Sequence, residues 1–200
     1  MKNLVSELIC TRISHDIIGN IGAVANASEL LEEGDLDFLE DIKSILRTSS
    51  FNLTARMKFF RMAFGLDNNA LSDLNLVKTT CDNYLASLGN SDYPIKLQAD
   101  WESIKQIKTA MVAIMVMADL LVRGGTVKVQ NLSDVLRVQI NCENKISADK
   151  WQNLQKMMDG DVTAVTANTA PLALLLEKYG IQRVILAKDE ENYYLKITEN

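Results

Sequence analysis

The chain contains a single histidine, His15, and residues that suit nucleophilic chemistry lie beside it. Asp16 follows it directly, and Arg12 precedes it by about one helical turn. Neutral imidazole is a competent nitrogen nucleophile, and a neighbouring carboxylate can fix its tautomer or raise its basicity. The three residues are therefore candidate catalytic residues, with an ordinary solvated histidine as the alternative.

The counts of histidine, cysteine and charge exclude several classes of protein. One histidine rules out HExxH zinc sites, multi-histidine metal sites and C2H2 fingers. The three cysteines, Cys10, Cys81 and Cys142, lie far apart, so we expect neither a disulfide scaffold nor a zinc finger. A net charge of −5 over 200 residues argues against a nucleic-acid partner. Glu7 and Arg12 interrupt any signal-peptide core, and no apolar run is long enough to span a membrane. We expect a soluble, cytoplasmic protein with no membrane partner.

The first third of the chain has the period of two helices. Apolar or small residues recur at spacings of three and four from Asn3 to Glu33, namely Ile13, Ile17, Ile21, Val24, Ser28 and Leu31. Gly34 suits a helix end and Asp35 a restart, and the second helix runs to about Phe64. Helices joined by so short a turn run antiparallel. Such a hairpin cannot bury its core alone, so we predict a homodimer through a four-helix bundle, with His15 on the side opposite the apolar stripe.

The period changes after a polar linker, Leu66 to Ser72. Strands are expected at 74–77, 94–98, 127–130, 135–140, 183–186 and 193–197, with a turn containing Asn131 and Ser133-Asp134 and another at 189–192. Helices are expected at about 79–88, 102–122, 148–158 and 169–179. The fold class is therefore α+β: a helical hairpin over residues 1–66, then an α/β sandwich over 73–200, with a mixed sheet and helices on one face.

Two sequence motifs resemble a known family. The run Arg12-Ile13-Ser14-His15-Asp16, followed by Ala23, Asn26 and Glu29-Leu30-Leu31, looks like the phospho-acceptor helix of two-component signalling. The second helix ends Phe60-Arg61-Met62-Ala63-Phe64-Gly65. Together they resemble the bacterial histidine phosphotransferases of the ChpT type. The resemblance implies a dimerisation and phosphotransfer hairpin joined to a degenerate domain that looks like a histidine-kinase ATPase domain and binds no ATP.

The resemblance also implies a phosphorelay. His15 would carry a phosphoryl group between aspartates of response-regulator receiver domains, and the receiver would bring Mg²⁺. This chain would bind no cofactor or metal of its own, and Asp16 would orient the imidazole or accept its proton. Arg12 would either steady the phosphate or pair with an acidic residue. The receiver would dock on exposed residues of the same helix beyond His15, namely Ile18, Gly22, Asn26 and Glu29. Arg61, Ala63, Phe64 and Gly65 match the family pattern, and packing of the helix end on the C-terminal domain explains them most simply.

One departure from related kinases lies just after the histidine. Sensor kinases carry a polar residue and then a proline four and five positions after it, where this chain has Gly19 and Asn20. The polar residue positions hydrolytic water in those kinases, so its absence puts phosphatase activity in doubt. The missing proline predicts that the helix continues straight past His15.

The nucleotide-binding motifs of this kinase class are missing together. The helix 111–121 has no asparagine to hold magnesium, the turn 141–146 has no glycine, and no glycine-rich lid is visible. The methionine-rich run 111–117 is interpreted as core. Two alternatives stay open: a divergent ATP-binding sensor histidine kinase fragment, or a dimeric interaction scaffold that transfers nothing.

Overall fold

The computed structural model describes residues 2–32, 34, 38–66, 68–141, 146–189 and 192–198. Its α-helices are α1 (Lys2–Glu32), α2 (Leu39–Phe64), α3 (Leu74–Ala86), α4 (Ile107–Ala118), α5 (Ala148–Met158) and α6 (Ala170–Tyr179). Its strands are β1 (Ile95–Ala99), β2 (Gly125–Leu132), β3 (Val135–Asn141), β4 (Val184–Lys188) and β5 (Asn192–Thr198). Short 3-10 turns lie at Asn69–Ser72, Trp101–Ser103, Val162–Ala164 and Ile181–Arg183.

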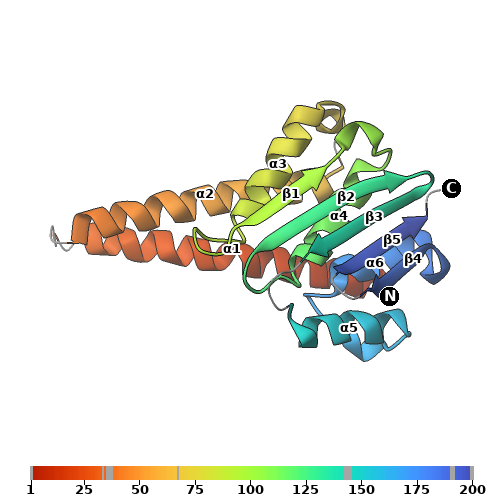
Figure 1. The fold of residues 1–200 in the computed structure, drawn as a ribbon. Helices are drawn as coiled ribbons and strands as arrows, with labels where there is room; N and C mark the ends of the chain where they lie inside the picture. Colours follow the sequence, from red (N-terminus) through yellow and green to blue (C-terminus); the bar gives the residue numbers. More distant parts are fainter. Residues whose placement is uncertain are drawn as a thin grey trace.

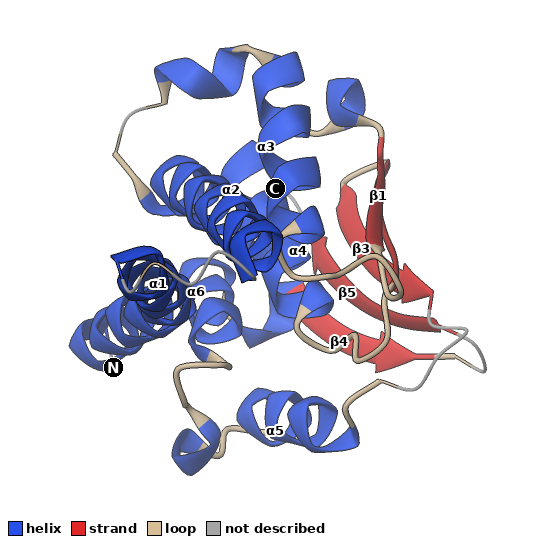
Figure 2. Cartoon of the chain, turned by 90° about the vertical axis from the view of Figure 1, so that its left-hand side faces the viewer, coloured by secondary structure: helices blue, strands red, loops and turns tan. Residues whose placement is uncertain are grey.

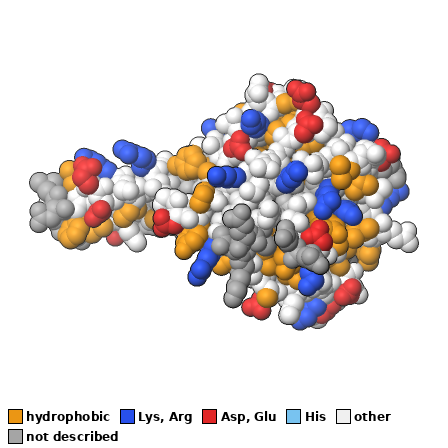
Figure 3. Space-filling view, in the orientation of Figure 1, with side chains coloured by type: hydrophobic (Ala, Val, Ile, Leu, Met, Phe, Trp, Pro, Cys, Tyr) orange, Lys and Arg blue, Asp and Glu red, His pale blue; other side chains and the backbone are white. Residues whose placement is uncertain are grey.

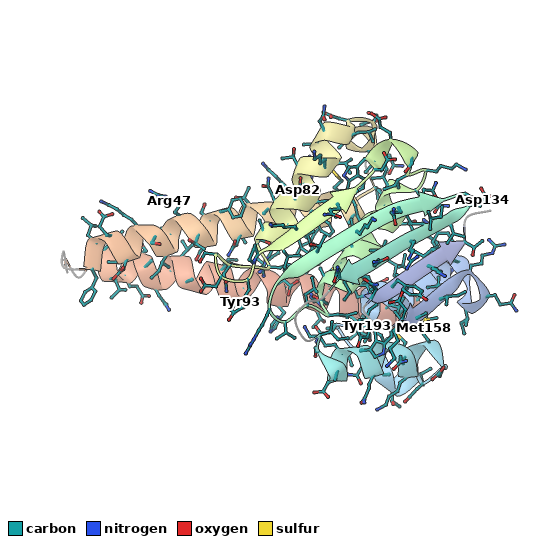
Figure 4. The ribbon with its side chains drawn as sticks, viewed as in Figure 1. Arg47, Asp82, Tyr93, Asp134, Met158 and Tyr193 are labelled. Carbon is teal, nitrogen blue, oxygen red and sulfur yellow. The ribbon has the colours of Figure 1, made fainter. Side chains whose placement is uncertain are left out.

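Helices α1 and α2 form the predicted antiparallel hairpin. Its distal half projects as an arm, while its base packs against α3, α4 and α6 (Figure 1). Arg47, on the distal half of α2, stands clear of the other elements (Figure 4). Helix α1 is continuous from Lys2 to Glu32, as the missing proline predicts. The base of the hairpin and the C-terminal part share one hydrophobic core, so the hairpin base packs directly on the C-terminal part.

The C-terminal part is a mixed five-stranded sheet in the order β1-β2-β3-β5-β4. The β1–β2 pair is parallel, and the β2–β3, β3–β5 and β4–β5 pairs are antiparallel. The helices lie on one side of the sheet, and in the described part of the chain no helix covers the other side (Figure 2). Because side chains alternate along each strand, Val127, Val129 and Val138 point to the helices and are buried. The expected α+β architecture is confirmed.

Helix α4 is the centre of this core. Every residue from Thr109 to Ala118 is buried, including Met111, Met115 and Met117. The methionine-rich run is therefore core, as expected, and its flexible side chains fill the space between the sheet and the hairpin base. Phe59 of α2 stacks on Tyr84 of α3 with ring centroids 3.8 Å apart, which joins the hairpin to the same core.

Several expected boundaries are wrong. Residues 74–77 form the first turn of α3 and not a strand, so the helix expected from Thr79 begins five residues earlier. The Asp73 side chain accepts a hydrogen bond from the Leu76 backbone N–H at 3.0 Å, which caps the helix. Val77 then continues a helical stripe that is buried in the core, so a short apolar run was mistaken for a strand.

Two smaller errors concern the helix before β2 and the turn between β2 and β3. The helix expected over 102–122 is divided into a 3-10 turn at Trp101–Ser103 and the shorter α4. Asn131 belongs to strand β2, and the β2–β3 turn consists of Ser133 and Asp134, with Ser133 at a φ of 60°. Gly34 has a φ of 74°, which suits its predicted place after α1. The predicted cap Asp35 and the turn residues 142–145 lie outside the described residues.

The predicted apolar stripe of α1 is only half covered. Ile13, Ile17 and Val24 are partly buried, while Ile21 and Leu31 are exposed. The most buried side chains are instead Val5, Ile9, Arg12 and Ala27, which face α2 and the C-terminal part. Within one chain the predicted stripe is therefore a flank of α1 and not its buried side.

The cap of α3 gives a stability prediction. Asp73→Ala removes the acceptor of the Leu76 N–H and should lower the free energy of unfolding by about 1 kcal/mol. Asp73→Ser keeps a capping oxygen and should lose much less. Urea unfolding followed by circular dichroism measures both, and equal losses in the two variants would contradict the capping role.

Candidate functional site

His15 lies near the middle of α1, on a side of the helix that faces solvent. Its side chain is 85% exposed. The helix turns about 100° per residue, so the buried positions Val5, Ile9 and Arg12 point elsewhere. A rigid helix thus presents the imidazole where another macromolecule can reach it.

Asp16 is placed between His15 and the interior. Its side chain is 12% exposed, and its Oδ1 lies 3.9 Å from Nδ1 of His15. Its Oδ2 accepts a hydrogen bond from Nε of Arg12 at 2.9 Å. The 3.9 Å separation is longer than a hydrogen bond, but a rotation of the exposed ring can shorten it, as in many sites without ligand.

Arg12 is the buried cation of the site. Its Nη1 and Nη2 donate to the two carboxylate oxygens of Asp119 at 2.5 and 2.6 Å, and Nη1 also donates to Oδ1 of Asn168 at 3.1 Å. Burial by itself lowers the Arg12 pKa, but hydrogen bonds and charge attraction from Asp119 and Asp16 outweigh it and raise that pKa. Of the two interpretations offered for Arg12, the structure shows the ion pair with acidic residues.

A second arginine holds the backbone beside the histidine. Nη1 of Arg56 donates to the Asp16 carbonyl at 2.9 Å, and Nη2 donates to the Ser87 carbonyl at 2.8 Å. Arg56 belongs to α2 and Ser87 follows α3, so three helices meet at this point of α1. The base of the hairpin is therefore tied to the C-terminal part next to His15.

The four predicted docking residues all lie on the exposed surface of α1. Ile18 is 67% exposed, and Gly22, Asn26 and Glu29 are exposed as well. A Cβ atom built on Gly22 would meet nothing within 4 Å, so the backbone there is open to close approach. These residues run from His15 toward the tip of the arm.

The residues at the end of α2 pack the helix against the C-terminal part. Ala63 is buried, and Phe64 packs partly buried against the core. A Cβ on Gly65 would collide with the Arg61 carbonyl oxygen, so the close turn after α2 requires glycine. The Gly65 carbonyl accepts a hydrogen bond from Nζ of Lys108 at 2.5 Å, which joins α2 to α4. Arg61 itself is exposed.

Of the two described cysteines, Cys81 is too buried to act as a nucleophile beside His15. Cys81 is buried in the core, and burial raises the pKa of its thiol, with a further contribution from Asp82. Cys10 is exposed on α1, and Cys142 lies outside the described residues.

Residue-by-residue reasoning missed Asp119, Asn168 and Arg56. One signal was available for Asp119, because it is the sole charged residue in the apolar run from Thr109 to Val122. A carboxylate in such a run needs a cationic partner. Asn168 and Arg56 carry no such signal, since their contacts depend on how distant segments pack.

The comparisons with known proteins agree with this architecture. Residues 83–191 match the family described as the histidine phosphotransferase C-terminal domain. A stretch of 66 residues is 46% identical to the protein phosphotransferase ChpT of Brucella abortus (strain 2308), and covers 33% of this chain and 31% of that protein. The match thus spans about a third of the length of that curated relative.

One solved structure shares the fold over nearly the whole chain. A bacterial phosphotransferase superposes with a TM-score of 0.71 at 21% identity, covering 96% of this chain and 94% of that one. The Acinetobacter baumannii histidine kinase AdeS gives a TM-score of 0.38 at 11% identity, covering 93% and 98%. Because the family match covers more than half of the sequence, the chain belongs to the histidine phosphotransferase family. Among the described residues, no helix is both long and apolar enough to cross a membrane.

The Arg12 cluster gives a second stability prediction. Arg12→Met leaves the carboxylates of Asp16 and Asp119 without their cation and should lower the free energy of unfolding by about 3–5 kcal/mol. Arg12→Lys keeps the charge but cannot reach all the acceptors, so its loss should be smaller.

A matched control is Arg47→Met on the exposed arm, expected to change stability by less than about 0.5 kcal/mol. Urea unfolding of the three variants measures the differences. Similar stabilities for Arg12→Met and Arg47→Met would show that the ion pairs do not hold the fold.

Proposed function

We propose that this chain is a phosphorelay histidine phosphotransferase that carries a phosphoryl group on His15 between aspartates of receiver domains. The observation that carries the proposal is the geometry at His15: an 85% exposed imidazole on a rigid helix, with an anchored carboxylate beside its Nδ1. Membership of the histidine phosphotransferase family supports it. The receivers are response regulators of the cytoplasm, and the proposal places this chain there with them.

The transfer needs no atom beyond those of the two partners. The lone pair on Nε2 of His15 attacks phosphorus, the bond between phosphorus and the donor aspartate oxygen breaks, and the carboxylate leaves. The Nδ1 proton stays on the ring, which becomes positive, and Asp16 stabilises that charge. In the second transfer an acceptor carboxylate attacks phosphorus, and the electron pair of the N–P bond returns to Nε2. The proposal assigns Mg²⁺ to the receiver, where it neutralises phosphoryl charge.

The space beside α4 supports transfer without ATP. Residues 111–121, most of which lie in α4, stand where the sequence comparison places the magnesium-binding helix of a kinase of this class. Here Val116, Asp119, Asn153 and Asn168 line a cavity of about 40 Å³, room for a few water molecules. Nζ of Lys150 donates to the Asp119 carbonyl at 2.8 Å beside it. Two of the lining side chains, Asp119 and Asn168, are the ones that hold Arg12 of α1.

The arm is proposed to form a four-helix bundle with a second copy of the chain. Hydrophobic side chains lie exposed along it (Figure 3), and they come from both helices: Ile21, Leu30, Leu31, Phe38, Ile45, Phe51 and Met57. A monomer rarely leaves so many apolar side chains in water on one element. A homodimer would cover the half-buried flank of α1 and present two copies of His15.

The receiver is proposed to dock on Ile18, Gly22, Asn26 and Glu29. Ile18 supplies an apolar contact with polar side chains around it, the usual arrangement of an interface centre. Gly22 leaves the helix backbone bare one turn further on, so a partner helix can approach closely.

Loss of the histidine should abolish transfer. A receiver carrying radiolabelled aspartyl phosphate should label the wild-type chain, and the label should survive alkali, as a phosphoramidate does. His15→Ala should accept no label while folding normally, because the side chain is exposed. Label on His15→Ala would contradict the assigned nucleophile.

The same assay separates the alternatives. Label transferred from ATP and Mg²⁺ alone would favour the divergent kinase. A dimer that accepts label from neither ATP nor any receiver of the same cell would favour the scaffold.

Two matched substitutions on α1 separate dimerisation from docking. Leu31→Glu places a charge on the apolar flank, about 24 Å along the helix from His15, and should convert the dimer to a monomer. Ile18→Glu should leave the dimer intact and slow transfer by about tenfold through weaker receiver binding. Light scattering and the transfer assay measure both. A monomeric wild type would refute the bundle, and unchanged transfer in Ile18→Glu would refute this docking face.

A further inference from the structure

The two oxygens of the Asp16 carboxylate have different partners. Oδ2 accepts the hydrogen bond from Nε of Arg12 at 2.9 Å, and Oδ1 is left facing Nδ1 of His15. The side chain of Asp16 is 12% exposed, so Arg12 rather than water determines which oxygen faces the ring. The orientation of Asp16 therefore depends on what holds Arg12.

Arg12 is held from the other side by the C-terminal part. Asp119, which follows the last turn of α4, accepts from both terminal nitrogens of the guanidinium, and Asn168 accepts from one of them. The pairing is bidentate, which fixes the plane of the guanidinium as well as its position. Arg12 and Asp119 are nearly buried, with side chains 7% and 13% exposed.

We infer that Asp119 is a positioning residue for His15, acting through Arg12 and Asp16. The inference rests on the proposed function for its catalytic meaning. Asp119 fixes the guanidinium and balances its charge, so that Asp16 is oriented by Arg12 and still keeps a free, strongly accepting Oδ1. This makes the C-terminal domain part of the phosphotransfer site, although among its described residues none is given a contact with the His15 ring.

The chemical consequence is the choice of ring tautomer. An anchored Oδ1 beside Nδ1 favours the neutral tautomer with the proton on Nδ1. That tautomer leaves the lone pair on Nε2, the nitrogen that projects away from Asp16 and toward an incoming phosphoryl group. If Asp119 is lost, the carboxylate can turn and the ring should return to the tautomer balance of a free histidine side chain.

The single histidine makes the test direct. In uniformly ¹⁵N-labelled protein, long-range ¹H–¹⁵N spectra show the ring nitrogens of His15 alone, and their shifts report the tautomer. Wild-type protein should show an excess of the Nδ1–H form. Asp119→Asn should shift both ring nitrogens toward the values of an unstructured histidine peptide, because the amide offers one acceptor and one repelling donor to Arg12.

Two further variants separate positioning from packing. Lys108→Gln also removes one charged contact between the C-terminal part and the hairpin, to the Gly65 carbonyl, but touches nothing near Asp16, so its ring shifts should match wild type. The double variant Asp119→Asn/Asn168→Asp exchanges the carboxylate and amide around one guanidinium. It should restore much of the wild-type tautomer excess, because Asn168 already lies 3.1 Å from Nη1.

The kinetic measurement uses a phosphorylated receiver at saturating and limiting concentration. Asp119→Asn should lower the maximal transfer rate by about tenfold and leave the half-saturating receiver concentration unchanged, because the docking face is intact. The exchanged double variant should recover most of the rate.

Wild-type ring shifts and transfer rate in folded Asp119→Asn would overturn the inference. Equal losses in Asp119→Asn and Lys108→Gln would also overturn it, as they would show a role in packing alone. If Asp119→Asn does not fold, Asn168→Ala carries the same expectation at smaller amplitude. If the wild-type chain accepts no phosphoryl group while its ring shifts depend on Asp119, the proposed function fails and the positioning of His15 by Asp119 stands.

Discussion

The ion pair between Arg12 and Asp119 determines how the hairpin meets the rest of the molecule. A guanidinium that is nearly buried on a long helix is costly unless its donors are satisfied, and here Asp16, Asp119 and Asn168 satisfy them. The pairing fixes the rotation of α1 about its own axis, because Arg12 can reach Asp119 from one side only. Once that rotation is fixed, His15 must face solvent, and the flank with Ile21 and Leu31 must face sideways.

Helix α1 thus divides its surface among three tasks. One side, with Val5, Ile9 and Arg12, packs on the core and the end of α4. The apolar flank is the proposed seam with a second copy of the chain. The remaining side carries His15, Ile18 and Gly22 and is the proposed surface for receivers. A helix has room for three such tasks because its side chains leave the axis in all directions. As a consequence, a rotation of α1 by one residue would disturb all three surfaces.

The elements that could be predicted from the sequence are those with a long, regular period. Helices α1 and α2 and the β2–β3 pair are of this kind. The exposed position of His15 also follows from the helical period of α1. The first turn of α3 was missed because four residues, 74–77, fit a strand as well as a helix, and only the Asp73 cap and the burial of Val77 decide between them. The half-covered stripe of α1 was assigned to the hairpin core because periodicity shows that a face is apolar but not what covers it.

The site was predictable only as far as local sequence reaches. His15, Asp16 and Arg12 lie within five residues, so their proximity follows from helical geometry. The contacts of Arg12 with Asp119 and Asn168 span 107 and 156 residues, and no local pattern specifies them. The lone carboxylate in the apolar run of α4 did indicate that some cation must be buried nearby. Under the proposed function, this carboxylate gives the C-terminal domain a task in phosphotransfer. Buried against the sheet, α4 is a fixed point from which Asp119 can hold Arg12, and a free hairpin has no such point.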